Sequence, residues 1–219
     1  MSLVLGIDEA GKGPVIGSMF VAGVVVRREN ITYLRRLGVK DSKLLSKYMR
    51  NVMYNIVKSC AEKIYVREVK PDIIDKENIN NILLSEFLEI VRAALNDFGA
   101  ELGLIFIDLP SMPPSKVKQA IIMLGFKGEI IAEHVADRKY VAVSAASIVA
   151  KTCREKHISE LKKIYGDFGS GYPSDPKTIS WIRSFYSNKG YLPPIVRKSW
   201  KTVKELAPTE YIEKKKKAR

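Results

Sequence analysis

The stretch LVLGIDEAGKGP, residues 3–14, decides how the rest of the chain is interpreted. Its apolar run is typical of a strand in a protein core, and the glycines and the proline end that strand. Two adjacent carboxylates, Asp8 and Glu9, stand where the apolar run stops. Carboxylates at the end of a core strand are costly to bury unless a cation joins them. The stretch therefore predicts a site for a divalent metal ion.

The charge of the chain indicates a polyanionic partner. The 219 residues carry a formal net charge of +13, and 46% of them are hydrophobic, which is sufficient for a core. An excess of Lys and Arg favours polyanions, and nucleic acid is the first candidate because phosphate neutralisation supplies most non-specific affinity. A lysine-rich surface of ion pairs, as in thermophilic proteins, is the alternative explanation.

Other classes of protein find little support. Cys60 and Cys153 lie far apart and predict neither a disulfide framework nor a zinc site. The first residues lack the features of a signal peptide, and no apolar run reaches the roughly 18 residues that a membrane helix needs. We therefore expect a cytoplasmic protein without a membrane partner.

The hydrophobic pattern predicts strands that alternate with helices. Strands are expected at residues 3–7, 18–26, 63–69, 102–107 and 129–133, the first two paired as a hairpin. Helices are expected after Ser42, as the N-cap of a helix through Ile56, and at residues 79–98, 113–124, 141–164, 176–188 and 199–206. Pro71 is expected to begin a turn. This order predicts an α/β fold with a mixed sheet and a helical C-terminal part.

Acidic residues follow three of these strands: Asp8 with Glu9, Asp108, and Asp137. In open α/β sheets, sites gather at the carboxyl ends of neighbouring strands. Four converging carboxylates would suit Mg²⁺ or Mn²⁺, and two such ions can stabilise the attacking and leaving oxygens of a phosphoryl displacement. A single strand-terminal Asp more often caps a turn or a helix, and that alternative stays open for Asp108.

The segment Gly11-Lys12-Gly13 allows close approach of the backbone and offers amide donors beside one cation. This combination favours a contact with a nucleic-acid backbone, with a simple tight turn as the alternative. Residues 6–12 also match most of a P-loop, but Gly13 stands where that motif needs Ser or Thr. Asp8 and Glu9 would repel the phosphates, so the P-loop is rejected.

A cluster of Gly, Pro and Ser at residues 168–176 predicts a subdomain boundary and contains Tyr172. A tyrosine on such a loop can stack on a base or sugar and contact a 2′-hydroxyl, although packing is its more common role. The two histidines, His134 and His157, are too scattered for a zinc site. His134 is the better placed of the two, because it lies three residues before Asp137.

Taken together, these motifs resemble ribonuclease HII, the type 2 ribonuclease H family, in its archaeal form. The matching segments are GIDEAGKGPVIGSM at 6–19, VKDSKLLS at 39–46, IFIDLP at 105–110, AEHVADRKYVAVSAASIVAKTCREK at 132–156, GSGYPSDP at 169–176 and VRKSW at 196–200. The resemblance implies a ribonuclease H-like fold with a central mixed β-sheet flanked by helices. It implies a catalytic domain at residues 1–168 and a helical substrate-binding region with a basic tail at residues 169–219.

The resemblance also implies an activity and its residues. The chain would hydrolyse the RNA strand of RNA:DNA hybrids and cut 5′ of ribonucleotides embedded in duplex DNA, by a two-metal mechanism that leaves 5′-phosphate and 3′-hydroxyl ends. The catalytic residues, which would hold Mg²⁺ or Mn²⁺, are Asp8, Glu9, Asp108 and Asp137. The residues expected to bind substrate are Gly11, Lys12, Gly13 and Tyr172 at the ribose 2′-hydroxyl, and Lys43, Lys139, Lys151 and Arg154 at phosphates.

The chain differs from the family pattern at Lys12, and its C-terminal segment leaves one protein partner undecided. Lys12 stands where arginine is the commoner residue, and lysine keeps the charge but weakens a bidentate contact. The segment APTEYIEKKKKAR at 207–219 carries no clear binding box for a sliding clamp, so that partner stays open. We expect a monomer. A non-catalytic nucleic-acid-binding module, or another metal-dependent phosphotransferase of the same fold, is the alternative function.

Overall fold

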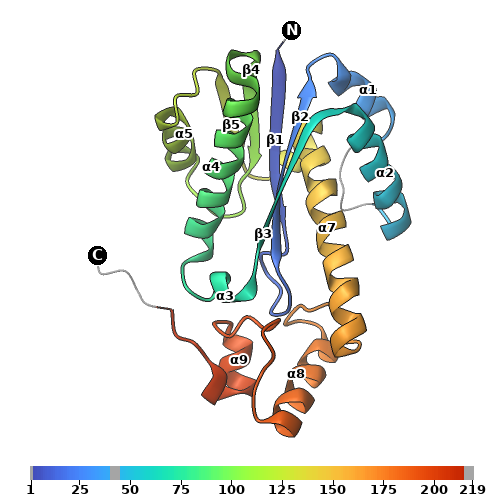
Figure 1. Ribbon diagram of the computed structural model, residues 1–219, viewed down its shortest axis with the longest axis vertical. Helices are drawn as coiled ribbons and strands as arrows, with labels where there is room; N and C mark the ends of the chain where they lie inside the picture. The colour runs from blue at the N-terminus through green and yellow to red at the C-terminus, as the bar shows by residue number, and fades with distance from the viewer. Residues whose placement is uncertain (1, 40–44, 215–219) are drawn as a thin grey trace. The chain divides into compact units, whose positions relative to one another are not determined.

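The computed structural model describes residues 2–39 and 45–214. Its sheet has five strands in the order β3-β2-β1-β4-β5 (Figure 1). The strands are β1 (Leu3–Ala10), β2 (Met19–Arg27), β3 (Ala61–Val69), β4 (Leu102–Asp108) and β5 (Glu129–Glu133). β1 pairs antiparallel with β2 and parallel with β4, and β4 pairs parallel with β5. The predicted mixed sheet and its opening hairpin are confirmed.

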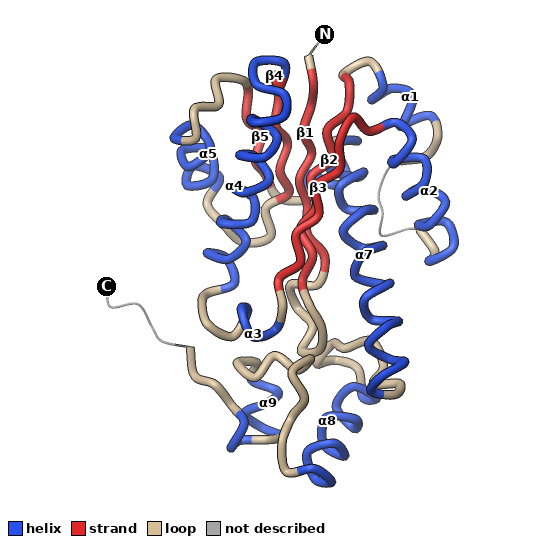
Figure 2. Tube along the Cα trace, in the orientation of Figure 1, coloured by secondary structure: helices blue, strands red, loops and turns tan. Residues whose placement is uncertain are grey.

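Helices follow or separate the strands along the chain (Figure 2). They are α1 (Asn30–Arg36), α2 (Lys47–Cys60), α3 (Pro71–Ile74), α4 (Ile79–Phe98), α5 (Pro114–Met123), α6 (Ala136–Lys139), α7 (Val141–Tyr165), α8 (Pro176–Lys189) and α9 (Lys201–Leu206). Short 3₁₀ segments lie at Gly99–Glu101 and Pro208–Glu210. The expected helix at 79–98 has the bounds that its apolar period and the following Gly99 predict.

The helix predicted after Ser42 begins at Lys47 instead. Its N-cap is Ser46, whose Oγ accepts a hydrogen bond from the Met49 N–H at 3.2 Å. Ser46 adopts the extended conformation that an N-cap requires, and its hydroxyl satisfies one of the unpaired amides of the first turn. Ser42 itself lies outside the described residues, as does Lys43.

Two short helices differ from the prediction. The turn expected at Pro71 is a four-residue helix, α3, with proline in its first turn, where a missing N–H costs nothing. Helix α1 was not predicted, because Leu34 is its single fully buried residue and one buried position creates no apolar period.

Helices α7 and α4 cover opposite faces of the sheet (Figure 1). A Cβ atom at Gly6 of β1 would lie 2.1 Å from the backbone of Ala142 in α7, so only glycine permits this close approach. On the other face, a Cβ atom at Gly23 of β2 would lie 2.4 Å from Ile90 of α4. The small residues of α7, Ser144 to Ser147, are buried because the helix packs so close to the strands.

The chain divides into two compact units. Unit 1 comprises Met1–Ala10, Phe20–Arg67 and Leu83–Cys153, and unit 2 comprises Gly11–Met19, Glu68–Ile82 and Arg154–Arg219. Each has a core: in unit 1 apolar residues of β1, β2 and α7 pack together, and in unit 2 Val15 and Ile16 pack with Phe168 and Ile182. The predicted division into 1–168 and 169–219 concerns function and stays a prediction.

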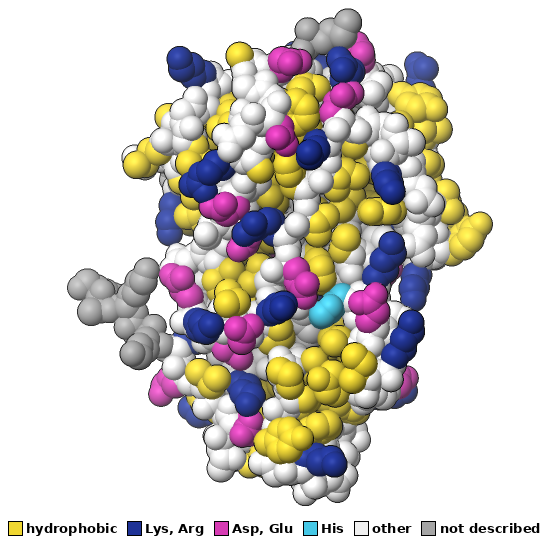
Figure 3. Space-filling view, in the orientation of Figure 1, with side chains coloured by type: hydrophobic (Ala, Val, Ile, Leu, Met, Phe, Trp, Pro, Cys, Tyr) yellow, Lys and Arg dark blue, Asp and Glu magenta, His cyan; other side chains and the backbone are white. Residues whose placement is uncertain are grey.

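Surface charge is mixed on the face in Figure 3, where Lys and Arg side chains lie among Asp and Glu. Ion pairs join Arg27 to Glu62 at 2.8 Å and Arg67 to Glu86 at 2.7 Å. Some of the surface Arg side chains are therefore paired, as the ion-pair explanation predicts, but such pairs leave the net charge of +13 unchanged. Among the described helices, none combines the length and the hydropathy that crossing a membrane requires.

Candidate active site

Three carboxylates of unit 1 meet toward the carboxyl ends of β1 and β4. Ile7 pairs with Ile107 across these parallel strands, so Asp8 and Asp108 come next on neighbouring strands. Asp108 ends β4 as predicted, but Asp8 and Glu9 lie inside β1, because the strand continues to Ala10 in its pairing with β2. One ligand oxygen from each of Asp8, Glu9 and Asp108 lies within 4.8 Å of the other two. An all-oxygen donor set of this kind suits a hard divalent cation.

The electrostatics of Asp8 also indicate a cation site. The side chain is only 4% exposed, and its pKa is raised well above the ordinary value, first by burial and then by Glu9 and Asp108. A hydrogen bond from Ser147 of α7 opposes this shift, and the Glu9 N–H donates to Asp8 Oδ1 at 2.7 Å. The negative charge of the cluster is thus unfavourable by itself, and a bound cation would offset it.

Asp108 also orders the loop that follows β5. Its Oδ1 accepts a hydrogen bond from the Ala136 N–H at 2.6 Å. Val135 before it has a φ of 61°, a left-handed conformation that is strained for a β-branched residue. His134 Nδ1 contacts the carbonyl oxygen of Leu109, so this histidine joins the loops after β4 and β5.

Asp137 lies in α6 rather than at a strand end, which corrects the prediction for this residue. The strand β5 ends four residues earlier, at Glu133, because the left-handed Val135 turns the chain into the short helix. Asp137 is 2% exposed, and its carbonyl oxygen accepts a hydrogen bond from Ser144 Oγ. The three-carboxylate group does not contain it, although Ala136, which binds Asp108, is its neighbour in the chain.

In unit 2, the turn Gly11–Gly13 is held by two side chains that lie far along the sequence. Arg197 is fully buried, and its Nη2 and Nη1 donate to the carbonyls of Gly11 at 2.6 Å and Lys12 at 3.0 Å. Trp200 Nε1 donates to the carbonyl of Gly13 at 3.0 Å. The turn therefore has a defined backbone conformation, in which Gly11 has a φ of 90°.

Tyr172 lies against this turn within the same unit. A Cβ atom at Gly13 would be 3.6 Å from Tyr172 Cε1, and one at Gly11 would be 2.7 Å from Cδ of Arg154. The Arg154 guanidinium lies 5.2 Å from the centroid of the Tyr172 ring, a cation–π distance. Tyr172 is 40% exposed, so its ring is held from one side and remains accessible. The structure thus brings together four residues that were expected to bind substrate.

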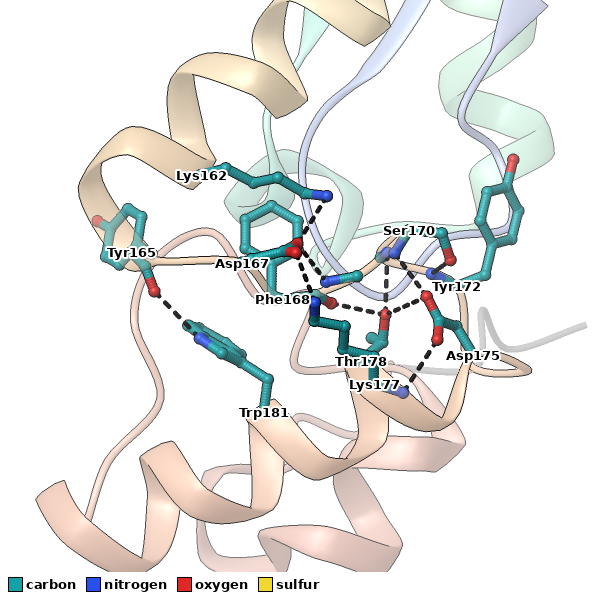
Figure 4. A network of polar contacts seen from close by, with 12 residues as sticks. Lys162, Tyr165, Asp167, Phe168, Ser170, Tyr172, Asp175, Lys177, Thr178 and Trp181 are labelled. Atoms are coloured by element: carbon teal, nitrogen blue, oxygen red, sulfur yellow. Dashed lines mark hydrogen bonds and ion pairs between the residues drawn. The ribbon is translucent and has the colours of Figure 1, made fainter.

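The loop that carries Tyr172 is fixed by Asp175 (Figure 4). Asp175 Oδ2 accepts a hydrogen bond from the Ser170 N–H at 2.6 Å, and Oδ1 accepts one from the Lys177 N–H at 2.9 Å. These bonds, that of Ser170 foremost, lower the pKa of Asp175 to about 2. The carboxylate also caps α8, so one charged side chain shapes the loop and begins the helix.

Thr178, which is fully buried, adds a second set of bonds to this loop. Its Oγ1 donates to the carbonyl of Phe168 at 2.8 Å and accepts from the Gly171 N–H at 3.0 Å (Figure 4). The Gly171 carbonyl in turn accepts from the Val15 N–H at 2.8 Å. The loop is thereby joined to the segment that follows Gly11–Gly13, which keeps Tyr172 beside the turn.

Comparison with known proteins identifies the family of this chain. The family model "Ribonuclease HII" matches residues 5–203. This chain belongs to the ribonuclease HII family. It is therefore a metal-dependent endonuclease that acts on the RNA of RNA:DNA hybrids, and the non-catalytic module suggested as an alternative is wrong.

Individual members of the ribonuclease HII family match nearly end to end. The ribonuclease HII of Sulfurisphaera tokodaii is 42% identical over 213 residues, which are 97% of this chain and 99% of that protein. The crystal structure of ribonuclease H2 from Pyrococcus horikoshii OT3 superposes with a TM-score of 0.86 at 38% identity, covering 95% and 98% of the two chains. Ribonuclease HII of Archaeoglobus fulgidus, in its complex with PCNA, has a TM-score of 0.81 at 38% identity, covering 93% and 96%.

The basic residues expected at phosphates have different surroundings. Lys139 is exposed and pairs with Glu133 at 2.9 Å. Together with Arg35 and Arg138 it lines a cavity of about 320 Å³ in unit 1. Lys151 is half-buried on α7, and Lys43 lies outside the described residues. Three basic side chains of unit 1 therefore line one cavity.

Sequence reasoning missed Arg197, although the segment that contains it was recognised. The signal available was its place in the sequence, directly after the apolar run Pro193–Val196 and three residues before Trp200. Its partners are carbonyl groups of the backbone, which carry no residue signature. A search for paired carboxylates therefore does not find such an arginine.

Proposed function

We propose that this ribonuclease HII also cuts 5′ of single ribonucleotides embedded in duplex DNA, leaving 5′-phosphate and 3′-hydroxyl ends. The observation that carries the proposal is the position of the Tyr172 ring beside Gly13 in unit 2, where an added Cβ atom would lie 3.6 Å from Tyr172 Cε1. A tyrosine hydroxyl and backbone amides at one place can recognise one ribose through its 2′-hydroxyl, the group that separates RNA from DNA. Recognition of a single sugar does not require a long hybrid.

We propose that Asp8, Glu9, Asp108 and Asp137 hold two divalent cations, Mg²⁺ or Mn²⁺. The close approach of three of these carboxylates and the raised pKa of Asp8 support this assignment. Asp8 would serve both ions, while Glu9 and Asp137 would each complete one site. When bound, two such ions stabilise the charge on the attacking and leaving oxygens of a phosphodiester.

The remaining residues position the substrate. Gly11, Lys12, Gly13 and Tyr172 are proposed to contact the ribose and its phosphate. The phosphate contacts along the duplex are proposed to be Lys43, Lys139, Lys151 and Arg154. Lys12 supplies one compact charge where a guanidinium would offer a planar fork, so we expect a weaker contact with phosphate than arginine would make.

The partners proposed are RNA:DNA hybrids and duplex DNA that contains ribonucleotides, with a sliding clamp as a possible further partner. The relative from Archaeoglobus fulgidus was solved in complex with PCNA. Residues 207–219 of this chain carry no clear binding box for a clamp, because they contain no Gln followed by spaced apolar and paired aromatic residues. We propose that the enzyme acts as a monomer in the cytoplasm.

The test uses three labelled duplexes of one sequence: a DNA duplex with one ribonucleotide, the same duplex in DNA alone, and an RNA:DNA hybrid. Cleavage is followed with Mg²⁺, with Mn²⁺ and with EDTA. We expect cuts 5′ of the ribonucleotide and throughout the hybrid, and none with EDTA. Cleavage of the hybrid alone would overturn the proposed recognition of single ribonucleotides. Cleavage of the all-DNA duplex would indicate the more general phosphotransferase.

A further inference from the structure

We propose that Arg197 and Trp200 are positioning residues that aim the amides of the Gly11–Gly13 turn at the ribose of the substrate. The inference rests on the proposed function of that turn in recognising the 2′-hydroxyl. It concerns two side chains that neither the sequence motifs nor the comparisons assign to the site.

The surroundings of Arg197 indicate that it shapes the backbone. The residue is fully buried in unit 2, between the core residues Val196 and Val203 in the sequence. Nε donates to the carbonyl of Gly17 at 2.8 Å, and Nη1 and Nη2 donate to the carbonyls of Lys12 and Gly11. A buried guanidinium is costly to desolvate, and here each of these bonds goes to a backbone carbonyl rather than to a carboxylate.

Peptide geometry then fixes the direction of two amides. In a trans peptide the N–H points opposite to the carbonyl of the same unit. Because the carbonyls of Gly11 and Lys12 face Arg197, the N–H groups of Lys12 and Gly13 point away from it. The carbonyl of Gly13 faces Trp200, and the next residue, Pro14, has no N–H. Both N–H groups therefore point to the side of the turn opposite to Arg197.

Arg197 also holds the segment that continues from the turn, through its backbone N–H and its side chain. The backbone N–H of Arg197 donates to the carbonyl of Val15 at 2.8 Å, and Nε holds Gly17. The guanidinium lies 5.0 Å from the centroid of the Trp200 ring, so the two positioning residues also stack on each other. The bound conformation of the turn is thereby prepared before substrate arrives, which reduces the entropy lost on binding.

Trp200→Phe is the decisive variant, because it removes the indole N–H and keeps an aromatic ring beneath Arg197. Trp181→Phe is the matched control. Trp181 Nε1 also donates to a backbone carbonyl in unit 2, that of Tyr165, at 3.1 Å. Both variants lose one indole donor from a half-buried tryptophan, but only one of these donors holds the turn. Arg197→Lys is a stronger perturbation that keeps the charge and loses the planar fork.

The measurement is fluorescence anisotropy in EDTA, where no cleavage occurs, with the single-ribonucleotide duplex and the all-DNA duplex. The Kd for the all-DNA duplex divided by the Kd for the single-ribonucleotide duplex reports how strongly the enzyme discriminates by the 2′-hydroxyl. We expect Trp200→Phe to lower this ratio about fivefold, which corresponds to one neutral hydrogen bond. Its Kd for all-DNA duplex should be unchanged, and Trp181→Phe should match wild type in both. Arg197→Lys should lower the ratio further.

Three outcomes would overturn the inference or its basis. If Trp200→Phe keeps the wild-type ratio, or weakens binding of both duplexes equally, Trp200 has a purely structural role. If Arg197→Lys fails to fold by circular dichroism, Trp200→Phe decides alone. If the wild-type enzyme neither binds the ribonucleotide duplex more tightly nor cleaves it, the proposed function itself is wrong. This result is seen in the wild type, so it is distinct from a failure of the inference, which is seen only in the variants.

Discussion

Replacing Asp8 by Asn removes one negative charge from the three-carboxylate cluster and leaves the shape of the side chain nearly unchanged. Oxygens of Asp8, Glu9 and Asp108 lie within 4.8 Å of one another. Two unit charges at that distance repel by about 3.5 kcal/mol at an effective dielectric constant of about 20. Burial, Glu9 and Asp108 all raise the pKa of Asp8, which is the direction that this repulsion predicts. Because solvent and side-chain relaxation screen part of the repulsion, we expect the metal-free variant to gain about 2 kcal/mol of unfolding free energy at pH 7.

The assay is thermal unfolding in EDTA at pH 7, together with cleavage in Mg²⁺. For a chain of this size, about 2 kcal/mol raises the melting temperature by about 4–8 °C. Asp72→Asn is the control: Asp72 is 63% exposed and pairs with Lys76 at 3.4 Å, so its loss should change little. Mg²⁺ should stabilise the wild type more than Asp8→Asn, and the variant should lose nearly all cleavage.

The opposite pattern would refute this reasoning. If Asp8→Asn has a lower melting temperature than wild type in EDTA, the carboxylate stabilises the metal-free fold. Its repulsion by Glu9 and Asp108 is then not a cost that a bound cation has to offset. If the variant unfolds at a higher temperature yet cleaves at the wild-type rate, the electrostatic argument stands but Asp8 is not catalytic.

Three further outcomes follow from individual contacts. Tyr172→Phe keeps the ring beside Arg154 and should lower kcat/KM on the single-ribonucleotide duplex about tenfold. The melting temperature should not change, because Tyr172 is 40% exposed, and a lower melting temperature would indicate a structural role for the hydroxyl. The pKa of Asp175 is lowered to about 2, so its stabilisation should be complete above about pH 4 and lost as pH falls toward 2. Urea unfolding should show less loss over that range for Asp175→Asn than for wild type. Ser46→Ala should cost about 1 kcal/mol of unfolding free energy, as expected for an N-cap, and an unchanged urea midpoint would refute the cap.

Much of the fold was predictable because apolar runs, apolar periods and terminal glycines are local signals in the sequence. The apolar run before Asp8 and the run before Asp108 are strands, and their register places the two acids side by side as sequence reasoning expected. The helix Ile79–Phe98 has its predicted bounds because a long apolar period and a terminal glycine are strong local signals. Short elements such as α1 and α3 were missed or misassigned because four to seven residues hold too little periodicity.

The sequence by itself determined which residues carry charge, which apolar runs form strands, and which family the motifs resemble. Only the tertiary structure decided how the Gly11–Gly13 turn is held, since Arg197 reaches the carbonyl of Gly17 across 180 positions of the chain. It also moved Asp137 from a strand end into α6, where a left-handed residue turns the backbone. Periodicity records the neighbours of a residue along the chain. Contacts between distant segments depend on the path of the whole chain, and backbone carbonyls look alike in every residue.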